Sequence, residues 1–347
     1  MSLTVTLGIH AIYFMLPLLI VLPESSWVLY LALLMRASEG LFTGIFWPVL
    51  EADISSVASF YTATESACCK ETGNGISLFN LGWNIGLLGG AISFLLLMEP
   101  GWLFLVLFIP LIVQAINLVL MAFYKDIKKE KLPAQCKDGH LIDKEKEQSN
   151  IYAVVLGIFI VFMYGFSLNL VYTTTTNFFN FLETSFALKV IWTLGILETL
   201  RIAFQTITST KFKHGNGSRY KIVLFTCFAI LAIMVAMGLS AGNIWYILFF
   251  GWYPFLGIVM GSNYAESINM VENAGFTGKK GQIMGFFEAS GSIGAFIGPF
   301  VAGYVTQTST YPASYFIGAI IFVPMIATVF LIVMLSRKKN NNASHLG

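Results

Sequence analysis

The chain has 347 residues, of which 56% are apolar and only 11% are charged, and its mean hydropathy is +0.76. A water-soluble domain carries roughly 25% charged residues, so the composition excludes that class and predicts an all-α polytopic membrane protein. The net charge of +2 is too small to indicate a nucleic-acid partner, and we expect none.

Ten apolar stretches follow one another along the chain, and each is close to the roughly 20 residues that a helix needs to cross a bilayer. They are 3–22, 26–51, 76–97, 102–124, 151–178, 185–210, 220–239, 243–270, 282–306 and 312–336. The charged stretch 125–150 separates four of them from the other six. We therefore predict a shortened N-terminal bundle (1–124), a cytoplasmic linker (125–150), a C-terminal six-helix bundle (151–336) and a basic cytoplasmic tail (337–347).

The basic residues are sorted by side of the membrane. Of the 20 Lys and Arg residues, 17 lie in or beside alternate connections or in the tail, and the other three, Arg36, Lys189 and Arg201, lie within predicted spans. By the positive-inside rule both termini are cytoplasmic, and we expect a multi-pass protein of the plasma membrane. The opposite connections carry only Glu24, Glu99 and Glu183.

The chain contains an internal repeat. Phe79, Ile85, Gly86 and Gly90 coincide with Phe287, Ile293, Gly294 and Gly298 at a constant offset of 208 residues, with the charged linker between the copies. Two parallel repeats joined by a cytoplasmic loop are a common plan for membrane transporters. Gly82, Gly86 and Gly90 recur every four residues, which predicts close helix packing rather than contact with a solute.

These features resemble the major facilitator superfamily over essentially the whole chain. The family's fifth-helix pattern G-x8-G-x3-G-P-x2-G-G falls on Gly73, Gly82, Gly86, Leu87, Gly90 and Ala91, with Leu87 in place of proline and Ala91 in place of glycine. Arg36, Glu39 and Gly40 are similar to the R-x-x-(Q/E)-G motif of the family's fourth helix. The resemblance implies a two-bundle fold and secondary transport.

The same alignment places the second and third predicted spans at the family's fourth and fifth helices. The family's first two helices, and the signature loop after them, then have no counterpart in this sequence. We expect an N-terminally shortened member with about ten transmembrane helices.

Charged residues inside the hydrocarbon are costly and are candidates for function by default. Arg36 and Glu39 lie three residues apart near the middle of one span, and Glu198 and Arg201 repeat that spacing in reverse order. Two interpretations stay open for each pair: a carboxyl group that takes up a proton and couples it to conformation, or a permanently ionised pair that merely tolerates burial. Glu288 has no cation nearby in sequence and is the better candidate for a lone titrating group; the alternative is a hydrogen bond to a neighbouring helix.

Other polar residues could line a cavity or a gate. The resemblance implies that Glu51 and Glu266 lie at the cytoplasmic gate, where Arg219 and Lys221 could pair with Glu266. The residues that could face a central solute cavity, or instead bond helix to helix, are Asn80, Trp83, Asn84, Asn169, Tyr172, Asn177, Asn263 and Tyr264.

The sequence lacks the motifs of several other function classes. We find no H-E-x-x-H zinc helix, G-x-S-x-G elbow or phosphate-binding glycine loop, so we expect no enzyme, no cofactor and no metal. The adjacent Cys68 and Cys69 cannot close an ordinary disulfide, which leaves reduced thiols. We predict a monomeric, proton-coupled secondary transporter of a small organic solute that works by alternating access in the lipid bilayer. The alternative is a transport-inactive, receptor-like or truncated family member.

Overall fold

The computed structural model describes residues 150–186, 190–211, 219–272, 274 and 280–344. It also describes 81–82 and 84–92, together with positions 27, 30, 31, 34, 38, 112, 115, 116 and 119. Residues 125–149 of the predicted linker 125–150, all of the first predicted span, and most of the second and fourth lie outside the described residues.

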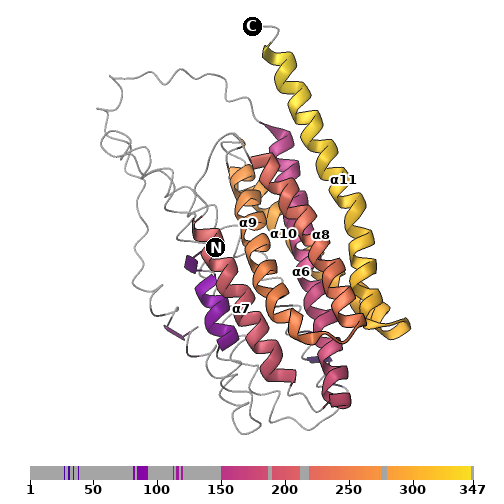
Figure 1. Ribbon diagram of the computed structural model, residues 1–347. Coiled ribbons are helices and arrows are strands. Elements are labelled where there is room, and N and C mark those ends of the chain that lie inside the picture. Colours follow the sequence, from indigo (N-terminus) through magenta and orange to yellow (C-terminus); the bar gives the residue numbers. More distant parts are fainter. Residues whose placement is uncertain are drawn as a thin grey trace.

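Six long helices form the C-terminal part of the chain (Figure 1). They are α6 (Ile151–Phe186), α7 (Val190–Lys211), α8 (Arg219–Gly242), α9 (Phe249–Glu272), α10 (Lys280–Thr308) and α11 (Tyr311–Ser344). A short 3-10 helix, η3 (Tyr246–Leu248), precedes α9. The described residues include no strand, which confirms the predicted all-α fold class. The total of about ten helices stays a prediction.

Each helix coincides with one predicted span, and the differences lie at the ends. α9 begins at Phe249 rather than at residue 243, because Asn243 and Ile244 close a turn on the end of α8 and Ile244 adopts a positive φ of 58°. α11 continues to Ser344, so the predicted tail is helical at least to that residue. α6 has 36 residues and a length of about 54 Å, which exceeds the thickness of a bilayer core.

Four described helices are long and apolar enough to cross a membrane. The segments are Ile151–Glu183, Tyr220–Gly242, Gln282–Thr308 and Tyr311–Ser336, in α6, α8, α10 and α11. α7 and α9 also have the length of a span, with 22 and 24 residues, but they carry several buried polar side chains. Among these buried polar side chains are Arg201 and Gln205 of α7 and Asn263 and Glu266 of α9.

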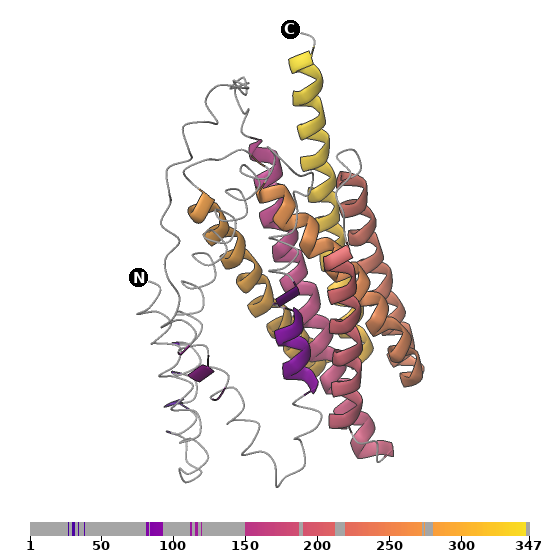
Figure 2. The ribbon, with the colours of Figure 1, turned by 90° about the vertical axis from the view of Figure 1, so that its left-hand side faces the viewer.

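The six helices pack in pairs that link the first three with the last three. α6 packs on α10, α7 on α9 and α8 on α11, while α6 and α9 also contact each other in the centre of the bundle. Figure 2 shows α10 beside α6, and α8 beside α11. Each of the first three helices thus has its main contact with one of the last three.

Glycines bring paired helices into backbone contact. A Cβ atom at Gly294 or Gly298 of α10 would collide with the backbone of α6 at Phe162 or Phe166. Gly86 and Gly90 are the repeat counterparts of these two glycines. In the described structure no atom lies within 4 Å of the position that a Cβ would take at either of them. The close packing predicted for Gly82, Gly86 and Gly90 is thus not seen among the described residues, whereas Gly294 and Gly298 of α10 do pack closely.

An aromatic cluster joins α6, α9 and α11 at the end opposite the chain's C-terminus. The ring of Phe249 lies 5.5 Å from that of Phe178, 5.6 Å from that of Phe179 and 6.2 Å from that of Tyr315. All four side chains are at most 1% exposed. Burial of such large rings, with offset or edge contacts, stabilises this end of the bundle.

Candidate functional site

The polar centre of the bundle is a file of three side chains on one face of α7. Glu198, Arg201 and Gln205 are spaced three and four residues apart, so they stack along the helix. Arg201 donates from Nε to Glu198 Oε2 at 2.8 Å, and from Nη1 to Gln205 Oε1 at 2.6 Å. The side chain of Arg201 is 7% exposed and that of Glu198 is 15% exposed. The guanidinium therefore lies deeper than the carboxylate and has two acceptors.

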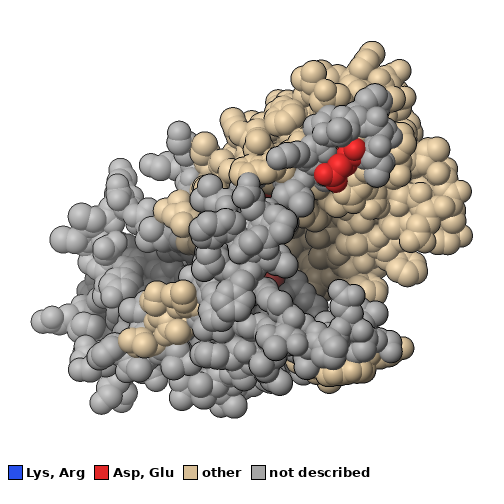
Figure 3. All heavy atoms as spheres, turned by 90° about the horizontal axis from the view of Figure 1, so that it is seen from below, with Lys and Arg blue, Asp and Glu red and all other residues tan. Residues whose placement is uncertain are grey.

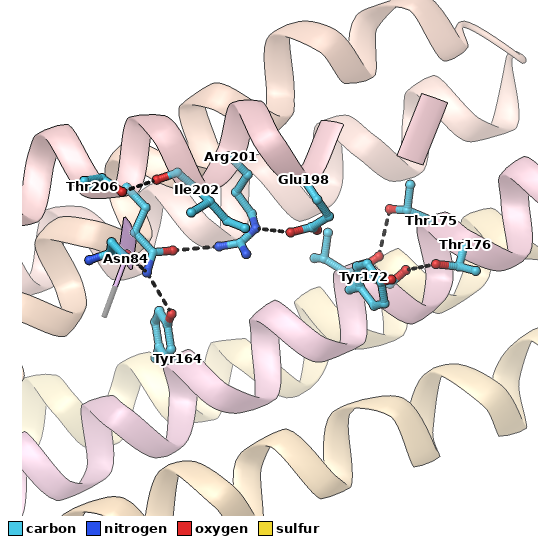
Figure 4. Close-up of polar contacts among 11 residues, drawn as sticks. Asn84, Tyr164, Tyr172, Thr175, Thr176, Glu198, Arg201, Ile202 and Thr206 are labelled. Carbon is cyan, nitrogen blue, oxygen red and sulfur yellow. Dashed lines mark hydrogen bonds and ion pairs between the residues drawn. The ribbon is translucent and has the colours of Figure 1, made fainter. Parts of the chain in front are cut away.

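Gln205 extends this file beyond α7. Its Nε2 donates to Asn84 Oδ1 and to the Tyr164 hydroxyl, each at 3.2 Å, and Asn84 Nδ2 donates to Ser209 Oγ at 3.2 Å. Asn84 and Gln205 are each 1% exposed. The carboxamide of Gln205 therefore bonds to Arg201 at one end and to Asn84 and Tyr164 at the other, and Figure 4 labels these three partners. One continuous polar chain thus joins three separate parts of the protein.

The contact with Asn84 is the one that crosses between distant parts of the sequence. Asn84 belongs to the helical segment 84–92, which lies beside α7 in both ribbon views (Figures 1 and 2). Asn84 and Gln205 are 121 residues apart in sequence, with the predicted linker between them. The sequence interpretation placed Asn84 among the cavity or helix-bonding candidates, and the structure shows an interhelical hydrogen bond.

Two glycines of α9 hold the backbone of α7 against α9 at these residues. A Cβ added at Gly257 would collide with the carbonyl oxygen of Arg201, and one added at Gly261 would lie 2.6 Å from that of Gln205. Glycine four residues apart is a common motif of close helix contact in membranes. The α7–α9 contact therefore fixes the positions from which Arg201 and Gln205 extend.

Tyrosines surround the polar file. The ring of Tyr164 lies 5.2 Å from that of Tyr264, which lies 6.2 Å from that of Phe287. Glu288 of α10 is half-buried and within electrostatic range of the Tyr164 hydroxyl. Tyr253 of α9 is 1% exposed and within electrostatic range of Glu198 and Arg201. Aromatic walls around one charged pair suit an organic ligand better than a small inorganic ion.

The other described candidates serve several different contacts. Asn169 donates to the carbonyl of Gly165 in its own helix, and Tyr172 is 42% exposed. Asn177 donates to Thr306 of α10 at 3.1 Å, and Asn263 donates to Thr226 of α8 at 3.0 Å. Asn177 and Asn263 therefore bond helix to helix, which was one of the two roles considered for them.

The predicted cytoplasmic gate is only partly described. Glu266 is 1% exposed, inside the bundle, and Lys221 is exposed on α8. Arg219 begins α8, but its side chain lies outside the described residues, so its pairing with Glu266 stays a prediction. Five other candidates also lie outside the described residues: Arg36, Glu39, Glu51, Asn80 and Trp83.

Sequence interpretation missed Gln205, Tyr164 and Ser209. Gln205 could have been found, because it lies on the face of α7 that carries Glu198 and Arg201. Tyr164 and Ser209 carry no such signal, since a tyrosine or a serine in an apolar helix is most often packing or a bond to its own backbone. Only the position of α6 and of segment 84–92 brings them together.

Figure 3 shows the face of the protein opposite the C-terminal end of α11. Among the described residues on this face, acidic atoms are visible and no lysine or arginine is. Glu183, close to the end of α6, is exposed.

Comparison with known protein families gives a match to the C-terminal part of the chain. The Major Facilitator Superfamily profile matches residues 213–346, which run from just before α8 to the end of the chain. No curated protein matches the chain.

Proposed function

We propose that this chain is a proton-coupled secondary transporter of a small organic solute and a member of the major facilitator superfamily, whose profile matches residues 213–346. The family match supports a membrane transporter in general. The coupling ion, the solute class and alternating access are our proposals. The transport-inactive alternative is not favoured by any of these observations.

The Glu198–Arg201 pair carries the proposal. An ion pair inside a membrane helix is expensive and is retained where it serves a substrate or proton path. Glu198 is the more exposed partner, and only one of its oxygens accepts the bond from Arg201. That arrangement suits a carboxylate that exchanges a proton with water or with a bound solute while Arg201 stays charged. Glu288, near Tyr164, is the second candidate for proton uptake.

The surroundings of the pair support a neutral or amphipathic organic solute. The opposite charges of Glu198 and Arg201 balance each other, and the neighbouring side chains are largely aromatic. A strongly anionic solute would require further arginines for bidentate contacts. Monomeric transport across the plasma membrane remains our expectation, with both termini cytoplasmic.

Transport in proteoliposomes tests the proposal. The full chain is reconstituted with a mixed solute panel, and solute movement is followed by mass spectrometry with and without an imposed pH gradient. We expect gradient-dependent movement of at least one solute. In Glu198→Gln or Glu288→Gln it should fall to the level of protein-free liposomes, because the neutral amide takes up no proton.

Glu183→Gln is the matched control, because this glutamate is exposed near the end of α6, away from the polar file. It should transport like the unmodified protein. Solute movement that is equal with and without the gradient would refute proton coupling. No movement of any solute, in a folded sample, would refute the transporter assignment for this panel.

A further inference from the structure

The hydrogen bonds of Gln205 connect two features of α7. One is the Glu198–Arg201 pair in α7, and the other is the contact between α7 and the segment 84–92. Hydrogen bonds join Glu198 to Arg201, Arg201 to Gln205, and Gln205 to Asn84. Gln205 is the residue that bonds to both Arg201 and Asn84.

The orientation of the Gln205 carboxamide is set from the Arg201 side. A carboxamide has one acceptor end and one donor end. Arg201 Nη1 occupies the acceptor Oε1 at 2.6 Å, and a guanidinium is a donor only. The donor Nε2 must therefore point away from Arg201, and there it meets Asn84 Oδ1 and the Tyr164 hydroxyl. If Arg201 moves, either end of the carboxamide can face Asn84.

The position of Arg201 is in turn set by Glu198. The carboxylate accepts from Nε, which fixes the plane of the guanidinium and directs Nη1 toward Gln205. Charge-assisted hydrogen bonds of this kind are about twice as strong as neutral ones. Without the negative charge on Glu198, the guanidinium of Arg201 is no longer held in this orientation. It can then turn away from Gln205, toward the more exposed end of the polar file.

We propose that Gln205 is a positioning residue that links the state of the Glu198–Arg201 pair to the contact between Asn84 and α7. Loss of the negative charge on Glu198, by proton uptake or by a solute that competes for it, releases Arg201. The carboxamide of Gln205 then loses its fixed orientation, and segment 84–92 is free to separate from α7. The inference rests on the proposed function for its role in transport, but the link itself is a property of the structure that can be measured without a solute.

The Asn84 contact is well placed for this role. Asn84 and Gln205 are almost completely buried, so an unpaired carboxamide there has no water to replace its partner. Ser209 adds a second bond to the same side chain one turn further along α7. A buried contact of this type has two distinct arrangements, bonded or separated, rather than a continuous range, as a two-state coupling element requires.

A distance measurement between spin labels at positions 85 and 207 tests the link. Ile85 and Ile207 neighbour Asn84 and Gln205 but are 56% and 49% exposed, so labels there leave the contact intact. The full chain, with its four cysteines replaced, is labelled at both positions in nanodiscs without solute. We expect one dominant distance in the parent protein. Gln205→Leu and Glu198→Gln should each raise the ratio of separated to bonded molecules by on the order of tenfold, a typical coupling strength.

Two comparisons distinguish a link from separate local effects. In the Gln205→Leu background, Glu198→Gln should cause no further change, because the connection is already broken. Thr208→Ala is the matched control on α7, since its hydroxyl bonds only to the carbonyl of Phe204, and it should leave the distance unchanged. An unchanged distance in Glu198→Gln, with a changed one in Asn84→Ala, would overturn the inference. So would additive effects of Glu198→Gln and Gln205→Leu.

The outcome is separable from that of the proposed function. If the distances respond as expected but no solute moves, the link exists and the transport proposal fails. If solute moves with the pH gradient but Glu198→Gln leaves the distances unchanged, the transport proposal stands and the link through Gln205 is wrong.

Discussion

Thr175 of α6 illustrates how single hydroxyl groups are used inside this bundle. Its Oγ1 donates to the carbonyl of Val171 at 2.8 Å in its own helix, so the Tyr315 hydroxyl, 2.6 Å away, donates to Thr175. Tyr315 is completely buried, and this bond joins α6 to α11. The neighbouring Thr176 donates only to Tyr172 of its own helix, as Figure 4 shows.

Replacing Thr175 by valine should therefore destabilise the protein. The change keeps the shape of the side chain but leaves the buried Tyr315 hydroxyl without its acceptor, at a cost of about 1–3 kcal/mol in the free energy of unfolding. Thermal unfolding in detergent, followed by intrinsic fluorescence, measures it. Thr176→Val removes only a bond to the helix backbone and should have a much smaller effect. Equal melting temperatures for the two variants would contradict the assigned role of the Thr175 bond.

The polar file on α7 shows a second feature at the residue scale, which is that burial increases along it. Glu198 is the most exposed of the three members and Gln205 the least. A proton or solute can therefore reach one end, while the other end is sealed inside the protein. In the proposed link, a change at Glu198 reaches Asn84 through side chains that become more buried along this path.

At the scale of elements, the α7–α9 contact depends on the small size of two residues. Gly257 and Gly261 let the backbone of α9 approach the carbonyl groups of Arg201 and Gln205. The same helix contains Gly251, where a Cβ would have no atom within 4 Å in the described structure. Two of the three glycines of α9 thus permit a helix contact and the third does not take part in it, a difference that the sequence does not show.

Gly257→Ala should separate α7 from α9, whereas Gly251→Ala should not. An added methyl group at position 257 forces the helices apart, at a cost of about 1–3 kcal/mol. Alanine at 251 gains helix propensity of up to about 1 kcal/mol and meets no obstacle. Unfolding midpoints of the two variants, measured side by side, compare them directly. A Gly257→Ala protein as stable as the Gly251→Ala protein would mean that the two helices do not pack as closely as described.

The contact between α6 and α10 also depends on glycines that let the two backbones approach each other. Gly294 and Gly298 lie in the second copy of the repeat, and the α6 backbone occupies the space that their side chains would need. The sequence repeat aligned them with Gly86 and Gly90 but predicted neither their close packing nor their partner. The partner is α6, which begins more than 100 residues earlier in the chain.

At the scale of the whole molecule, large apolar side chains cover the outside of the bundle. Ile320 of α11 is 67% exposed, and Phe296 and Phe300 of α10 are 74% and 71% exposed. In water this surface would cause aggregation. In a bilayer the lipid tails cover this surface, so the exposed apolar side chains face lipid rather than water.

The substitution Ile320→Asp tests whether this surface of α11 faces lipid. Ile320 lies near the middle of the span Tyr311–Ser336, and an aspartate at the centre of a membrane helix costs roughly 2.5–3.5 kcal/mol of insertion free energy. We expect a large fall in folded protein recovered from the membrane fraction by size-exclusion chromatography. Ser309→Asp, in the exposed turn between α10 and α11, should be recovered like the parent. Equal recovery of the two variants would argue against α11 as a span.

The sequence by itself determined the membrane class, the helical fold, the positions of six helices and the family resemblance. Those properties depend on composition, on the length of apolar stretches and on local repeats, all of which can be read along the chain. It also located Glu198 and Arg201, because charge in hydrocarbon is conspicuous. Only the tertiary structure decided that Gln205 connects this pair to Asn84, and which glycines form contacts. Those facts depend on which distant helices lie side by side, and one-dimensional patterns do not record that.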